Sequence, residues 1–95
     1  MDIKKVDAST RGGHIDTDFE FTLNQPEVET LASDAMKATL LAVCTGALGL
    51  LGPVAAQYII SHIDDVKRNS GPNGAYVKMT IRDGTQLHVW EVYAQ

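Results

Sequence analysis

Residues 38–60 decide the fold, and they read ATLLAVCTGALGLLGPVAAQYII, without a charged side chain. Gly52-Pro53 divides the run, because glycine is typical of the end of a helix and proline of the first turn of the next one. The run therefore predicts a helical hairpin at about 38–60, made by one helix over about 26–50 and a second over about 53–68. After Lys37 the first helix has no polar face.

Helical periodicity divides the apolar residues of the first helix into two opposite stripes. The stripe that we expect to face the core consists of Val28, Leu31, Ala32, Ala35, Ala42, Val43, Gly46 and Leu50. The opposite stripe consists of Leu40, Leu41, Cys44, Leu48 and Leu51. A domain this small cannot cover both stripes, and an exposed apolar patch usually marks an interaction site. We expect the second stripe to bind a membrane or a partner; the alternative is that this helix is simply the central core helix.

The chain before the helical region alternates in the manner of a strand with one polar face. One face carries Ile15, Thr17, Phe19, Phe21 and Leu23, and the other carries His14, Asp16, Asp18, Glu20 and Thr22. Gly12-Gly13 supplies the positive φ angles of a tight turn. A two-residue turn there predicts a β-hairpin in which Val6 lies opposite Phe19.

The chain after the helical region predicts a second β-hairpin. Asp83-Gly84 is a type I′ turn signal between two runs of strand-forming residues. A two-residue turn places Trp90 opposite Val77 and puts His88 on the core face.

These elements predict an α+β fold in the order ββααββ, within a single domain that spans residues 1–95. The simplest arrangement that buries the apolar faces is a two-layer α/β sandwich, in which two helices cover one face of a four-stranded antiparallel sheet built from two β-hairpins.

Composition excludes several classes of function. The net charge is -4, and the eight Lys and Arg residues are scattered, whereas nucleic-acid binding requires clustered positive charge. A single cysteine excludes an internal disulfide framework and a multi-cysteine metal site. No phosphate loop, nucleophile elbow or dinucleotide fingerprint occurs, so we expect neither a cofactor nor an enzyme.

Two groups of ionisable residues are candidate sites. His14, Asp16 and Asp18 share one strand face and could bind a divalent cation, although their spacing of roughly 6.6 Å favours a solvated acidic face. In the group His62, Asp64 and Asp65, the histidine and Asp65 are three residues apart on one helical face, which permits an acid/base pair or, more simply, a surface pair.

Three residues of the last strand have alternative roles. His88, if buried in its neutral form, would make stability fall as the pH approaches 6. Trp90 and Tyr93 could form an exposed aromatic anchor, but the position of Trp90 on the apolar face favours core packing.

Two functional hypotheses follow. The first is a non-catalytic, exported membrane-active or toxin-like protein that uses the apolar helical hairpin; the second is a soluble binding or oligomerisation module whose apolar helix face mates with itself or with a partner protein. At the level of fold alone, the predicted sandwich resembles small secreted killer toxins of fungi that act on membranes, and fold does not imply function.

Compartment is predicted from the N-terminus. Residues 1–6 lack the apolar segment of a signal peptide. The toxin-like hypothesis implies a secreted protein, and the chain would then be the mature form with the leader absent; a cytoplasmic location also fits.

Overall fold

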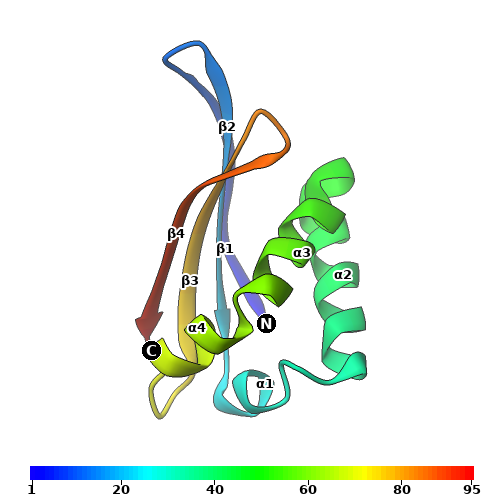
Figure 1. The fold of residues 1–95 in the computed structure, drawn as a ribbon, viewed down its shortest axis with the longest axis vertical. Helices are drawn as coiled ribbons and strands as arrows, with labels where there is room; N and C mark the ends of the chain where they lie inside the picture. Colours follow the sequence, from blue (N-terminus) through cyan, green and yellow to red (C-terminus); the bar gives the residue numbers. More distant parts are fainter.

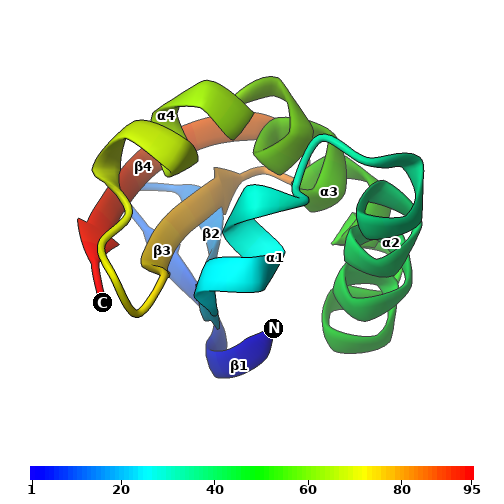
Figure 2. The same ribbon diagram turned by 90° about the horizontal axis from the view of Figure 1, so that it is seen from below.

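A four-stranded antiparallel sheet carries all of the helices on one face (Figures 1 and 2). The computed structural model describes residues 1–95. The strands are β1 (Asp2–Arg11), β2 (His14–Leu23), β3 (Ala75–Arg82) and β4 (Gln86–Ala94), and they lie side by side in chain order. The helices are α1 (Gln25–Glu29), α2 (Asp34–Leu48), the 3₁₀ turn η1 (Gly49–Leu51), α3 (Gly52–Ser61) and α4 (Ile63–Asn69). The predicted α+β sandwich is confirmed.

The first β-hairpin forms in the predicted register. Val6 lies opposite Phe19 across β1 and β2. Gly12 and Gly13 have φ values of 56° and 82°, which side chains other than glycine rarely adopt. The alternation of apolar and polar residues in β2 therefore sets which side chains face the helices.

The second β-hairpin contains the predicted turn. Asp83 and Gly84 both have positive φ, and the Thr85 N–H donates to the Arg82 carbonyl oxygen at 3.2 Å. Both features are those of a type I′ turn. The first strand pair after the turn is Arg82 with Gln86, one residue further along than a two-residue loop would give.

The register beyond that turn differs from the prediction by two residues. Trp90 lies opposite Met79, and not opposite Val77. The longer loop adds one residue and a β-bulge at His88 adds the second, because Thr80 pairs with Val89 while Ile81 pairs with Leu87. Trp90 stays on the core face since the shift is even. The placement of His88 on that face is wrong; its side chain is exposed.

The predicted helix over 26–50 is two helices. A capping box between Asn24 and Glu27 starts α1, with Pro26 in its first turn as predicted. The helix then ends at Thr30, and Ser33 caps a new helix by accepting a hydrogen bond from the Met36 N–H at 3.1 Å.

The predicted helix over 53–68 is also interrupted. His62 has φ -116° and ψ 24°, outside the helical range, and it separates α3 from α4. The His62 Nδ1 donates to the Tyr58 carbonyl oxygen at 2.7 Å, which satisfies an acceptor at the end of α3. At this break the His62 ring lies 4.6 Å from the Trp90 ring of β4.

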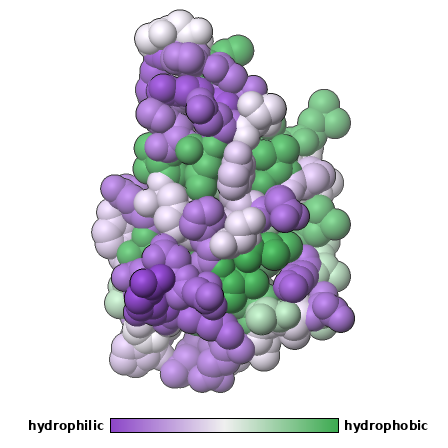
Figure 3. All heavy atoms as spheres, viewed as in Figure 1, coloured by the Kyte–Doolittle hydropathy of each residue, from purple (hydrophilic) through white to green (hydrophobic).

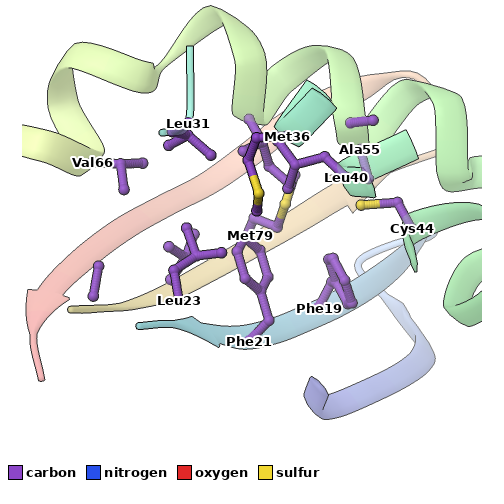
Figure 4. Packing of buried hydrophobic residues seen from close by; sticks show 14 of the residues in the cluster. Phe19, Phe21, Leu23, Leu31, Met36, Leu40, Cys44, Ala55, Val66 and Met79 are labelled. Atoms are coloured by element: carbon purple, nitrogen blue, oxygen red, sulfur yellow. The ribbon is translucent and has the colours of Figure 1, made fainter. Parts of the chain in front are cut away.

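The core lies between the sheet and the helices (Figure 4). Leu23, Leu31 and Val66 lie together at one end, beneath α1 and α4, while Phe19, Leu40 and Cys44 lie together at the other end, beneath α2 and α3. Met36 and Met79 lie between these two groups. Sixteen residues form this cluster, and its two ends are covered by different helices.

The sheet extends beyond the helices that cover it (Figure 1). Val6 and Ile15 belong to the face that turns toward the helices, but they are 47% and 61% exposed. The strands β1 and β2 have ten residues each, so they project past the end of the helical layer. The far end of the β1–β2 hairpin is therefore uncovered on both faces.

Candidate functional site

The candidate site is the pair of helices α2 and α3, joined by η1; we call residues 34–61 the apolar hairpin. The two helices lie side by side (Figures 1 and 2). Asp34 in the first turn of α2 favours the positive end of the helix dipole. Gly49, with φ 62°, ends α2, and Pro53 lies in the first turn of α3. The predicted helix start at Pro53 is confirmed, but the glycine that ends α2 is Gly49, and Gly52 is the first residue of α3.

Gly52 is the residue that lets the two helices approach. A Cβ atom at this position would lie 2.4 Å from the Thr45 Cα and 2.5 Å from the Thr45 backbone nitrogen. Any side chain would force the backbone of α2 away from that of α3. Ala55 and Ala56, both buried, continue the close contact along α3. The tight turn therefore depends on small residues at the helix crossing.

The five residues predicted to form an outward stripe are divided between two surfaces. Leu40 and Cys44 are fully buried in the core, so their placement on an outer surface is wrong. Leu41 is 46% exposed, and Leu48 and Leu51 are partly buried. The break at residues 30–33 rotates α2 relative to a continuous helix, which brings the Leu40 side of α2 onto the sheet.

The same rotation exposes residues that we expected in the core. Ala42 and Gly46 lie on the outer surface of α2. Leu50 lies at the tip of the apolar hairpin and is 98% exposed. An unbroken helix to residue 50 would place Leu50 on the inner stripe, and the end of α2 at Leu48 removes that placement. The glycines at positions 49 and 52 were the signal that this segment forms a turn.

The outer surface of the apolar hairpin contains a shallow groove between the two helices. The groove has a volume of about 410 Å³, and Leu41 and Ile60 lie on its sides. The complete lining is Lys37, Ala38, Leu41, Pro53, Ala56, Gln57 and Ile60. Figure 3 shows hydrophobic residues gathered over the helices, whereas the projecting end of the β1–β2 hairpin is mostly hydrophilic.

Lys37 is the only charged residue that lines this groove. No Asp, Glu, Lys or Arg occurs between Lys37 and Asp64. By length and composition, the segment Asp34–Ser61 is apolar enough to cross a membrane, and 22% of its most apolar window is buried. Core helices of soluble proteins and signal sequences can meet the same criterion. In this fold the segment bends back on itself at η1.

Comparison of the chain with protein-family models, curated proteins and solved structures finds no match. The chemistry of the residues is therefore the basis for a functional proposal.

Cys44 lies on the inner side of the apolar hairpin. Burial raises the pKa of its thiol to about 11. A thiol with this pKa carries almost no thiolate at neutral pH, and the thiolate is the nucleophilic form. Cys44 therefore acts as a small core residue in the folded protein.

The polar face of the sheet is an ion-pair network. Asp16 is 1% exposed and accepts two hydrogen bonds from Arg82, at 2.9 and 3.1 Å. Asp18 accepts two from Arg11, at 3.2 and 2.6 Å, and one from the Thr80 hydroxyl at 2.7 Å. The expected solvated acidic face is wrong, because β2 is an inner strand with side chains from β1 and β3 on either side.

Arginine contacts also explain the pKa values in this network. The Arg11 guanidinium holds the pKa of Asp18 at about 2, with burial acting in the opposite direction. Arg82 lowers the pKa of Asp16 in the same way. His14 lies away from both carboxylates and contacts Asp83 at 2.7 Å instead. The residues considered as a cation site therefore pair with three different partners.

The second group of ionisable residues is held by an aromatic contact. The rings of His62 and Trp90 lie 4.6 Å apart, and the Trp90 Nε1 donates to Asp65 at 2.6 Å. Asp64 is exposed and takes no part in this arrangement. Trp90 is partly buried against the core, as the apolar position predicted, whereas Tyr93 is 49% exposed. Through their contacts with Trp90, His62 and Asp65 hold α4 against β4.

Proposed function

We propose that this protein is a non-catalytic, membrane-active protein that inserts the tip of the apolar hairpin into the interface of a lipid bilayer. The observation that carries the proposal is Leu50, an almost fully exposed leucine at the turn between two helices that have no charged side chain after Lys37. A leucine gains roughly 1.5 to 3 kcal/mol on moving from water to an apolar environment. In a monomer in water the Leu50 side chain stays exposed, so the protein does not gain this transfer free energy.

The dimensions favour insertion of the tip over a complete span. The fifteen residues of α2 make a helix about 22 Å long, since each residue adds about 1.5 Å. The hydrocarbon core of a bilayer is about 30 Å thick. The helices are therefore too short to cross the whole hydrocarbon core and long enough to reach about halfway through it.

Charge indicates which lipids fit this surface. Lys37, at the start of α2, is the only cation in the apolar hairpin, and the whole chain has a net charge of -4. Anionic lipids attract interfacial helices through several lysine and arginine residues, whereas this surface has one. We expect binding to zwitterionic phosphatidylcholine to be at least as strong as binding to vesicles that contain phosphatidylserine.

Dye leakage from phosphatidylcholine vesicles, measured beside sedimentation of the free protein, tests the proposal. Leakage caused by a protein that sediments as a monomer supports it. A protein that neither binds vesicles nor releases dye at micromolar concentration contradicts it.

The groove on the apolar hairpin favours a second candidate, self-association. Ala38, Ala42 and Gly46 recur every four residues on the exposed side of α2, and such small residues let another helix approach closely. A second copy would bury Leu41 in the contact. A stable dimer that leaves vesicles intact would favour this candidate, and Leu41→Asp should then convert the dimer to a monomer.

A further inference from the structure

Both breaks in the predicted helices lie at the base of the apolar hairpin. The first lies between α1 and α2, where the Ser33 N–H donates to the Thr30 carbonyl oxygen at 2.9 Å. The second is His62, whose N–H donates to the Ile59 carbonyl oxygen at 3.0 Å. Ala32 and Ser61, beside the two breaks, are exposed. Rotation at these two junctions would leave the helical hydrogen bonds within α2 and α3 intact.

The chain outside both junctions is fixed to the sheet. Leu31 precedes the first junction and Val66 follows the second, and both are fully buried. The stacking of His62 on Trp90, together with the hydrogen bond from Trp90 to Asp65, holds the beginning of α4. These contacts stay in place if only the apolar hairpin moves.

The apolar hairpin itself has few polar contacts with the sheet. No ion pair joins residues 34–61 to the rest of the chain. One side-chain hydrogen bond joins the apolar hairpin to the turn between β3 and β4, from the Tyr58 hydroxyl to the Thr85 carbonyl oxygen. Two others, between Ser33 and Met36 and between His62 and Tyr58, lie within the junctions. The remaining contacts are apolar: α2 packs on α3, and Leu40, Cys44 and Ile59 pack in the core that the hairpin shares with the sheet.

We infer that the apolar hairpin is a hinged unit, which opens away from the sheet about the junctions at 32–33 and 61–62 while α1, α4 and the sheet remain folded. The Tyr58–Thr85 hydrogen bond acts as its latch. The inference rests on the proposed function for its purpose: opening presents Leu40, Cys44 and Ile59 to lipid, in addition to the exposed tip. Apolar contacts can be exchanged for lipid contacts without leaving a buried charge unpaired.

Native-state hydrogen exchange of the intact protein in water tests the hinge directly. We expect the amides of residues 36–61 to exchange through one shared opening, at least tenfold more often than the amides of β2 and β3. Equal opening of the apolar hairpin and the inner strands would overturn the inference, because the domain would then open only as a whole. So would independent rates along α2 and α3, which indicate local fraying.

Tyr58→Phe removes the latch and keeps the ring. It should raise the exchange of residues 36–61 about fivefold, the effect expected for one hydrogen bond, and leave β2 and β3 unchanged. Tyr93→Phe is the matched control, because its hydroxyl contacts Glu91 within the same strand. If Tyr58→Phe unfolds the protein, the exchange pattern of the natural chain still decides the question.

Vesicle binding separates this inference from the proposed function. Shared opening in water without any binding to phosphatidylcholine vesicles would support the hinge and contradict the membrane proposal. Vesicle binding without a shared opening would support insertion of the exposed tip alone and overturn the hinge.

Discussion

Replacing Leu50 by aspartate should separate membrane binding from folding. Leu50 is 98% exposed, so the substitution removes almost no contact within the domain. Substitutions at such positions change stability by about 0.5 kcal/mol or less. The free energy of unfolding in urea should therefore match that of the natural chain.

The same substitution should have a large effect on the transfer of the tip into lipid. Loss of leucine burial removes about 1.5 to 3 kcal/mol. Placing aspartate at depth in a bilayer adds up to about 3 kcal/mol, and less near the interface. Since about 1.4 kcal/mol corresponds to a tenfold change, the vesicle partition coefficient should fall at least about tenfold.

Co-sedimentation with phosphatidylcholine vesicles measures this partition coefficient. Asn73→Asp is the matched control, because it makes the same change in net charge at an exposed turn outside the apolar hairpin. The control should bind vesicles within about twofold of the natural chain, since the turn makes no contact with the membrane in this mode. The reasoning would be refuted if Leu50→Asp bound vesicles as well as the control while both remained folded.

Three further predictions concern stability. Leu40→Ala should lower the free energy of unfolding by about 2 to 5 kcal/mol in urea titrations, because Leu40 is fully buried; a loss below about 1 kcal/mol would place it outside the core. Gly52→Ala should lower the melting temperature, since its Cβ would meet the α2 backbone, whereas Gly46→Ala, with open space around it, should leave the temperature unchanged or raise it. Asp18, whose pKa Arg11 lowers from 3.8 to about 2, should contribute about 1 to 2 kcal/mol above pH 4; stability should fall as the pH decreases from about 4 to 2, and Asp18→Asn should flatten that part of the stability curve.

The two β-hairpins were predictable because their signals are local. Gly12 and Gly13 supply positive φ angles, and the period-two alternation of β2 assigns Phe19 and Phe21 to one face. The turn at Asp83-Gly84 was equally visible. The bulge at His88 was not, because a one-residue insertion depends on how β4 twists to pack against α4.

The orientation of α2 could not be predicted. The segment from Ala38 to Leu51 is apolar on all sides, so periodicity cannot distinguish an inner face from an outer one. The cap at Ser33 sets the phase of α2, and a serine at that position is compatible with either a cap or the interior of a helix. The candidate site therefore shares Leu41 with the predicted stripe and adds Leu50.

By itself, the sequence determined where the chain turns and which segments become strands or helices, because these choices depend on residues within a few positions of each other. Only the tertiary structure decided which side of the helical segment is covered, where the helices break, and that Asp16 and Asp18 are buried beside arginines. Those outcomes depend on contacts between distant segments, above all the pairing of β2 with β3 and the packing of α2 on α3. The free energy of such contacts depends on the surface that two elements bury against each other, and this area cannot be read from a short stretch of sequence.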